Sequence, residues 1–173
     1  LDGAWALRSP GSALKPFTYA LALERGMHPC SVVADVPSAF ATPTGIYRPN
    51  NYNHHFYGPV GLRFALGNSL NVPAVRVLES IGGAPTLYRA MQQLGVSSFL
   101  HGPEYYGLGL TLGNGEVRLL ELTNAYAAFA RLGEFQPYRF LAKEAPALAA
   151  PRRVFTPTTA YLIADMLSDD SAR

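Results

Sequence analysis

The sequence predicts a mainly α-helical fold with little β-sheet. Start and stop signals for helices recur along the chain, with proline or threonine at the beginning of several apolar segments and glycine at their ends. The residue pattern of a β-strand is confined to residues 31–36 and to a short stretch at 153–155. We therefore expect more than half of the residues to be helical and no sheet of three or more strands.

The first helix is expected at residues 12–25. This segment is apolar on most of its faces and is followed by Gly26, a residue type that commonly ends helices. Pro16 lacks a backbone N–H and is best tolerated in the first turn, so the helix must begin within residues 12–15. Residues 27–57 follow as a long irregular segment rich in proline, asparagine and glycine, and such segments are usually functional or poorly ordered.

Further helices are predicted by the same signals. Short helices are expected at residues 59–66, 73–81 and 84–94. Residues 116–132 form the longest periodic segment, with one apolar face and Gly133 after its end. After a connector rich in alanine and proline at 134–154, Thr156 is expected to cap a final helix that ends near residue 167.

Composition excludes several classes of function. Hydrophobic residues make up 49% of the 173 residues and charged residues only 15%, well below the usual quarter, which is typical of a piece that packs against more protein. The net charge of +2 comes without a clustered basic tract, so we expect no binding of nucleic acid. The apolar runs are too short to cross a bilayer. A single cysteine, Cys30, excludes an internal disulfide.

The most informative stretch is Ser12-Ala13-Leu14-Lys15. Residues three apart share one face of a helix, so the Lys15 amine can reach toward the Ser12 hydroxyl. A serine becomes a good nucleophile when a base takes its proton, and an amine serves as that base if burial or nearby positive charge lowers its pKa. The spacing suits acyl transfer through a covalent serine intermediate. A simpler interpretation also fits these four residues, in which Ser12 caps the helix and Lys15 is solvated.

A second polar pair, Ser69 and Asn71, lies in the loop expected between two short helices. In one interpretation these side chains form a turn and cap the helix that begins near Val72. In the other they contribute polar groups to a functional site.

Three stretches, in this order, resemble the class A high-molecular-weight penicillin-binding proteins. They are residues 8–17, 68–75 and 108–127. This family, like the serine β-lactamases, carries Ser-x-x-Lys, then Ser-x-Asn, then a Lys-Thr-Gly-type triplet. The first two motifs are present here as Ser12 with Lys15 and Ser69 with Asn71, and the resemblance extends over about residues 7–139.

The third family motif is absent from the chain. The only two lysines are Lys15 and Lys143, and Lys143 is followed by Glu144. In the family, the triplet lies on a sheet strand C-terminal to the helical region. We therefore interpret residues 1–173 as an internal piece of a longer protein. It would be the helical subdomain of the α+β fold of penicillin-binding proteins and serine β-lactamases, carrying the first two motifs, with most or all of the five-stranded sheet absent.

The resemblance implies a peptidoglycan D,D-transpeptidase. Ser12 would attack the D-Ala–D-Ala amide of a stem peptide, with Lys15 as base, and an amine of a second stem peptide would resolve the acyl-enzyme. Ser69 would relay a proton between Lys15 and the leaving amine, and Asn71 would bind Lys15 and the peptide amide. The oxyanion hole would use the Ser12 N–H and a second N–H from the absent strand.

The expected partners are peptidoglycan stem peptides, β-lactam antibiotics that acylate the same serine, and the remainder of the transpeptidase domain. The parent protein would be anchored in the inner membrane, face the periplasm and carry a glycosyltransferase domain upstream. Without the triplet, the isolated piece is expected to be inactive.

Three alternatives stay open at this point. A serine β-lactamase or a D,D-carboxypeptidase shares the motifs but hydrolyses the acyl-enzyme with water, and the flanking residues argue against both. A β-lactam sensor domain would be a binding module, recognised by transmembrane segments in the parent. A degenerate transpeptidase would act as a non-catalytic scaffold.

Other candidate residues have simpler explanations. The histidines, among them the adjacent pair His54 and His55, have no acidic or cysteine partner at ligand spacing, so we expect no metal and no cofactor. Cys30 has no basic neighbour to lower its pKa and is expected to be inert. Residues 48–53 resemble a family loop that borders the cleft, although a turn-forming composition explains them equally well. The glycines of residues 108–113 favour a tight backbone beside the core rather than phosphate binding.

Overall fold

The fold is a group of helices packed around one central helix. A computed structural model describes residues 2–42, 45–141 and 150–172. Helices account for 48% of the structure, and every sheet in the described residues has only two strands. The mainly helical fold is confirmed. The helix content falls slightly below the expected half because short strands occupy parts of the segments between the helices.

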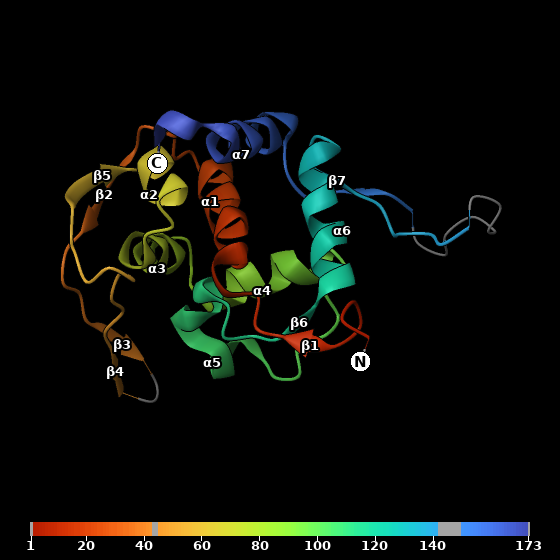
Figure 1. Cartoon of the computed structure of the whole chain (residues 1–173), viewed down its shortest axis with the longest axis horizontal. Helices are drawn as coiled ribbons and strands as arrows, with labels where there is room; N and C mark the ends of the chain where they lie inside the picture. The colour runs from red at the N-terminus through yellow and green to blue at the C-terminus, as the bar shows by residue number, and fades with distance from the viewer. Residues whose placement is uncertain (1, 43–44, 142–149, 173) are drawn as a thin grey trace.

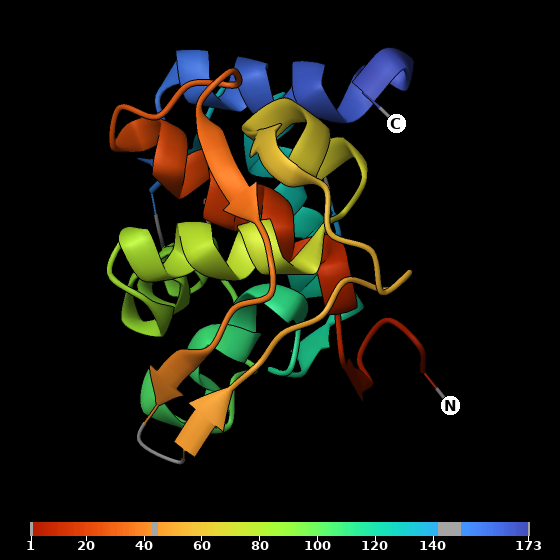
Figure 2. The same cartoon turned by 90° about the vertical axis from the view of Figure 1, so that its left-hand side faces the viewer.

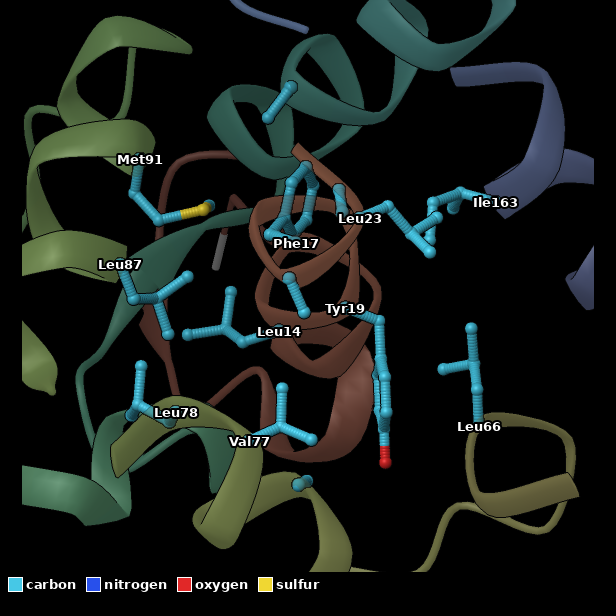
Figure 3. Close-up of a cluster of buried hydrophobic side chains, with 14 of the residues drawn as sticks. Leu14, Phe17, Tyr19, Leu23, Leu66, Val77, Leu78, Leu87, Met91 and Ile163 are labelled. Atoms are coloured by element: carbon cyan, nitrogen blue, oxygen red, sulfur yellow. The ribbon is translucent and has the colours of Figure 1, made fainter. Parts of the chain in front are cut away.

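The central helix, α1 (Lys15–Glu24), continues a 3₁₀ turn, η1 (Gly11–Leu14). Pro16 lies in its first turn, as expected, and eight of its ten residues are buried. Figure 3 shows apolar side chains from neighbouring helices around this helix, with Leu87 and Met91 on one side and Leu66 and Ile163 on the other. A helix buried on nearly all sides explains why its sequence shows no polar stripe.

The remaining helices surround α1 (Figure 1). They are α2 (Leu62–Gly67), α3 (Asn71–Ser80), α4 (Ala84–Gln93), α5 (Pro103–Tyr106), η2 (Gly107–Leu112), α6 (Leu119–Ala130), α7 (Pro157–Ser168) and η3 (Asp170–Ala172). Thr156 caps α7 as predicted, since its side chain accepts a hydrogen bond from the Thr159 N–H. The short helices α5 and η2 were not predicted, because glycine-rich segments carry a weak helical pattern.

In the part of the chain that the structure describes, the strands form four antiparallel pairs. These are β1 (Leu7–Arg8) with β6 (Val117–Arg118), β2 (Val32–Asp35) with β5 (Gly58–Gly61), β3 (Phe40–Thr42) with β4 (Gly45–Tyr47), and β7 (Glu134–Phe135) with β8 (Arg152–Arg153). Only β2 and part of β8 were predicted. In Figure 2, β2 and β5 lie on the face of the molecule turned to the viewer, beside α3.

Two predicted boundaries were wrong for the same reason. The helix expected at residues 59–66 begins only at Leu62, because Pro59 and Val60 belong to β5 and pair with β2. The helix expected at 116–132 begins at Leu119, because the two residues before it pair with β1. In both cases, the local pattern allows a helix or a strand, and pairing with a distant segment selects the strand. Part of the connector 134–154, with Lys143, lies outside the described residues.

Ion pairs, a hydrogen bond and apolar packing hold the C-terminal helix, α7, against the rest of the molecule. The Arg63 guanidinium in α2 pairs with Asp165 at 2.5 Å and Asp169 at 3.0 Å, near the end of α7. At the start of α7, the Thr156 N–H donates to the Glu24 carboxylate over 2.7 Å.

Within the parts of the chain that the structure covers, no helix has the length and apolar character needed to cross a bilayer.

Candidate active site

The first residue of α1, Lys15, is the centre of the candidate site. This residue is only 1% exposed, and its Nζ donates to the Ser69 carbonyl oxygen at 2.5 Å, to Ser69 Oγ at 3.1 Å and to Asn71 Oδ1 at 2.7 Å. The three N–H groups of an ammonium thus meet three acceptors. The interpretation of Lys15 as a solvated lysine is wrong, and the structure brings the two sequence motifs together.

Ser12 lies one turn before Lys15. The Lys15 N–H donates to the Ser12 carbonyl oxygen, which closes a 3₁₀ turn. Residues i and i+3 eclipse one another in such a turn, so both side chains leave the same side of the helix. Ser12 is exposed. It does not act as a cap, because the position before η1 belongs to Pro10 and the turn has no side-chain cap.

Two later segments of the chain form hydrogen bonds with residues around Ser12. The Tyr126 hydroxyl of α6 donates to the Ala13 carbonyl oxygen over 2.7 Å. Ser9 Oγ donates to the Gly113 carbonyl oxygen over 2.6 Å. Gly113, at φ +82°, packs against the backbone of Gly11 so closely that no Cβ would fit. The glycine-rich stretch at 108–113 therefore serves a tight backbone packing, as its composition indicated.

Burial and hydrogen bonding act on Lys15 in opposite directions. Burial disfavours the ammonium form and lowers the pKa of Lys15 from 10.5 to about 8. The three acceptors favour the ammonium form and oppose this decrease. At a pH near 8, the ammonium and the neutral amine are therefore both populated. A general base is most effective when its pKa lies near the working pH.

Ser69 is the acceptor through which Lys15 can exchange a proton. A neutral amine has two N–H groups and one lone pair, so one of its three acceptors must change its role. The Ser69 carbonyl and the Asn71 Oδ1 can only accept, whereas the Ser69 hydroxyl can also donate. Deprotonation of Lys15 therefore leaves the Ser69 hydroxyl to donate to its lone pair. The geometry allows a proton to pass between these two side chains.

The backbone at Ser69 adopts a left-handed conformation, with φ +52°. This region costs a non-glycine residue roughly 1 kcal/mol. The turn is held by the Ser69 N–H, which donates to the Leu66 carbonyl at 3.0 Å, and by the Leu70 N–H, which donates to the Ala65 carbonyl at 2.9 Å. The turn aims both oxygen atoms of Ser69 at Lys15. A small cleft of about 150 Å³ opens beside it.

Helix α3 is capped from a distant loop. The capping interpretation of Ser69 and Asn71 is wrong, because Leu70 is the cap residue and has no side-chain bond. Instead, Asn51 Oδ1 accepts from the Asn71 N–H at 2.8 Å and from the Val72 N–H at 3.3 Å. Asn51 is 2% exposed. Sequence reasoning predicted only a turn or a cleft border for this loop, since an Asn-Asn pair in a polar segment carries no signal of burial.

The remaining candidates of the sequence take no part in the site. His54 Nδ1 lies 2.9 Å from Asn50 Nδ2 in the same loop, and Cys30 is an exposed free thiol. Among the residues that the structure describes, no group of three or more histidine, cysteine, aspartate or glutamate side chains is placed to hold a metal ion.

An exposed serine one turn from a buried lysine, with a second serine and an asparagine on that lysine, is the arrangement of a serine acyltransferase. Comparison with known proteins agrees with this class. The family model for the penicillin-binding protein transpeptidase domain matches residues 4–173. The chain therefore belongs to the penicillin-binding protein transpeptidase family.

Individual relatives place the chain among the class A proteins, as the motifs predicted. It is 39% identical to penicillin-binding protein 1C of Escherichia coli over 173 residues, which cover 99% of this chain and 21% of that protein. It is 38% identical to penicillin-binding protein 1A of Aquifex aeolicus over 136 residues, 77% of this chain and 18% of that one. The chain thus spans about a fifth of the length of these relatives.

Solved structures show the same fold. Penicillin-binding protein 1A from Haemophilus influenzae matches 96% of this chain with a TM-score of 0.79 at 25% identity, over 30% of its own length. PonA1 from Mycobacterium tuberculosis, in a complex with penicillin V, matches 96% of this chain with a TM-score of 0.81 at 25% identity, over 48% of its own length. The helical subdomain predicted from the sequence is therefore confirmed.

Proposed function

We propose that this chain carries the nucleophile and the base of a peptidoglycan D,D-transpeptidase, and that residues 1–173 are the helical part of its transpeptidase domain. The observation that carries the proposal is the buried Lys15 amine, bonded to Ser69 and Asn71 one turn from the exposed Ser12. Membership of the family supports the reaction class.

In the acylation step, the Ser12 Oγ attacks the carbonyl carbon of the penultimate D-Ala residue. As the C–O bond forms, the lone pair of the neutral Lys15 amine turns from the Ser69 hydroxyl to Ser12 Oγ and takes its proton. The negative charge that develops on the carbonyl oxygen is stabilised by the Ser12 N–H, and a strand of the complete domain would supply a second N–H. Two donors aimed at this oxygen would lower the barrier to the tetrahedral intermediate.

When that intermediate collapses, the C–N bond to the terminal D-Ala breaks. The leaving nitrogen needs a proton, and Ser69 can pass one to it from Lys15. The product is an ester between Ser12 and the stem peptide. An amine of a second stem peptide then attacks this ester, forms the cross-link amide and returns Ser12 to its hydroxyl form. A β-lactam ring would react in the same first step.

The proposal places the complete protein at the periplasmic face of the inner membrane, with a glycosyltransferase domain in the same protein. The 173 residues by themselves are proposed to be inactive. They contain no Lys-Thr-Gly-type triplet, which in the family supplies the second oxyanion donor and a group that holds the substrate carboxylate.

Labelling of the full-length gene product with a fluorescent penicillin tests the proposal. We expect one adduct per molecule at Ser12, located by mass analysis of peptides, and none in Ser12→Ala. With a D-Ala–D-Ala donor peptide and an amine acceptor, the protein should form the new amide faster than the hydrolysis product. Rapid turnover of the adduct by water would support a β-lactamase or a carboxypeptidase instead. A full-length protein that does not label would support a non-catalytic scaffold.

A further inference from the structure

A chain of buried polar groups leads from β2 to the lysine of the proposed site. It begins at Asp35, the last residue of β2, which is 0% exposed. Both of its carboxylate oxygens lie 2.9 Å from Asn51 Nδ2, and one accepts from the Tyr57 N–H at 2.9 Å. Asn51 in turn contacts the start of α3, which carries Asn71.

The carboxylate determines which way the Asn51 amide faces. An ionised carboxylate can only accept hydrogen bonds, so the Asn51 NH₂ group must face Asp35. The same NH₂ group also donates to the His55 carbonyl at 2.8 Å, which is again only an acceptor. The Asn51 oxygen must therefore point in the opposite direction, toward the N–H groups of Asn71 and Val72.

Those N–H groups need an acceptor from outside the helix. The first N–H groups of an α-helix have no partner within it, and here the cap residue Leu70 has an apolar side chain. Asn51 supplies the missing oxygen. The Asp35 charge behind it is also favourable near the positive end of the α3 dipole.

The side chain of Asn71 is oriented by the same loop. Its Nδ2 donates to the Asn50 carbonyl over 2.8 Å, so its Oδ1 must face the Lys15 amine, at 2.7 Å. Two neighbouring residues of the loop thus hold both the backbone and the side chain of Asn71. A loop displacement would move the acceptor that fixes Lys15.

We infer that Asn51 is a positioning residue for the acylation of Ser12, and that Asp35 fixes its orientation. The inference rests on the proposed function. Asn51 is 2% exposed, and its hydrogen bonds go to Asp35, to the His55 carbonyl and to the start of α3 rather than to Ser12. It acts by keeping Asn71 at the first position of α3, with its carbonyl oxygen on the Lys15 amine, so that the amine stays one turn from the nucleophile.

Paired substitutions in the full-length protein test this inference. Asn51→Asp places two carboxylates face to face, and Asp35→Asn places two NH₂ groups in competition for too few acceptors. The double variant, Asp35→Asn with Asn51→Asp, restores one donor and one acceptor across the contact, and the carboxylate introduced by Asn51→Asp can still accept from α3, while the His55 carbonyl loses its donor. We therefore expect the rate constant of acylation at saturating fluorescent penicillin to fall at least tenfold in each single variant and to recover in part, by at least threefold over the slower single variant, in the double variant.

Two further measurements separate positioning from folding. Asn124→Ala is the matched control, because Asn124 is also a buried asparagine, 8% exposed, but its side chain in α6 bonds the loop carbonyl of Gln136 at 3.0 Å and not a group that contacts Lys15. It should lose stability without losing acylation rate. For the variants at 35 and 51, the loss should fall on the acylation rate constant and not on the concentration of penicillin that gives half the maximal rate.

The inference is overturned if single variants that melt above the assay temperature acylate at the wild-type rate. It is also overturned if the double variant is no faster than the slower single variant. A wild-type protein that does not label, or a Ser12→Ala variant that does, would overturn the proposed function together with this inference. Labelling of the wild type with unchanged rates in the variants would overturn the positioning role alone.

Discussion

Lys15 Nζ donates to Asn71 Oδ1 over 2.7 Å and so joins the first residues of two helices, α1 and α3, that are 56 positions apart in the sequence. The two helices also pack against each other in the core. The contact places an amine and a polar carbonyl in a partly buried position, where a hydrogen bond gains strength from the lower local dielectric. Together with the two bonds from Lys15 to Ser69, it ties the nucleophile region to the second motif.

Replacing Lys15 with methionine should slow acylation strongly while leaving the fold intact. Methionine keeps most of the length of the side chain but has no amine, and the loss of a general base typically slows a reaction about 10²- to 10⁴-fold. Removal of a buried charge offsets the loss of partners for the Ser69 and Asn71 oxygens, so we expect stability to change by less than about 2 kcal/mol. Fluorescent labelling and chemical unfolding of the full-length protein check this.

The matched control is Lys143→Met, which removes the other lysine of the chain. It belongs to neither motif and should leave the labelling rate unchanged. Equal losses in both variants would argue against Lys15 as the base.

Acylation should become faster as the pH rises through about 8. Burial lowers the pKa of Lys15 to about 8, and only the neutral amine can take the proton of Ser12. The rate at which a fluorescent penicillin labels the full-length protein, measured from pH 6.5 to 9.5, should follow this ionisation. Because the 173-residue chain has only two lysines, NMR of this chain with ¹³C-labelled lysine also titrates Lys15 directly, with one signal that changes near pH 8. A rate that is flat across this range would contradict the assignment.

Stability should rise with pH between about 8 and 10. The folded pKa of Lys15 lies below its unfolded value of 10.5, so in this window the unfolded chain holds a proton that the folded chain has lost. The full shift corresponds to roughly 3 kcal/mol. Below pH 8 both states are protonated, and the contribution is constant. Urea unfolding at several pH values measures it, and Lys15→Met should remove the rise.

Above about pH 10 the buried tyrosines reverse this trend. Burial raises the pKa of Tyr126 to about 12, and burial followed by the Asp35 charge raises the pKa of Tyr19. The unfolded tyrosines then lose protons that the folded ones keep, so stability falls with pH. The window from 8 to 10 therefore isolates Lys15.

The isolated 173 residues should form no covalent adduct with a fluorescent penicillin within minutes. One oxyanion donor, the Ser12 N–H, is present, but the loss of a second donor typically costs about 10²- to 10³-fold in rate. Exposure of the cleft to water further weakens the interactions that tune Lys15. Intact-mass analysis of the chain beside the full-length protein decides the matter. Rapid stoichiometric labelling of the chain alone would show that the triplet is not needed.

Gly113→Ala should destabilise the protein and disturb the Ser12 turn. The new methyl group would collide with the Gly11 backbone, in addition to the cost of φ +82° for a residue with a side chain. Gly26→Ala is the matched control, because its φ is +89° but nothing lies within 4 Å of the added carbon. The control should lose about 1 kcal/mol, and Gly113→Ala clearly more, by urea unfolding. Equal losses would show that the close approach to Gly11 carries no energy.

Much of the helical framework could be predicted from local signals. Pro16 in a first turn, Gly26 after an end and Thr156 as a cap each act within a few residues, and the structure has α1 and α7 close to the expected limits. The strands were mostly missed. A two-residue strand such as β1 exists only because β6 lies beside it, and no periodicity can appear in so short a segment.

The candidate site was also predicted only in part from the sequence. Ser12, Lys15, Ser69 and Asn71 were identified by their spacing and by the resemblance of their flanks. The geometry adds that Lys15 is buried and bonded to Ser69 and Asn71. The two residues that hold Asn71 from the other side, Asn50 and Asn51, were left as a turn or a cleft border, because turn formation and buried hydrogen bonding use the same amide side chain.

The sequence by itself thus determined the order of the helices and the two motifs, since propensity, capping and residue spacing are written into neighbouring positions. Only the tertiary structure decided that Lys15 is buried, that Ser69 takes a left-handed backbone and that Asp35 orients Asn51. Each of these depends on segments far apart in the chain. Burial and hydrogen-bond direction are properties of the surroundings that folding creates, so no local pattern of residues contains them.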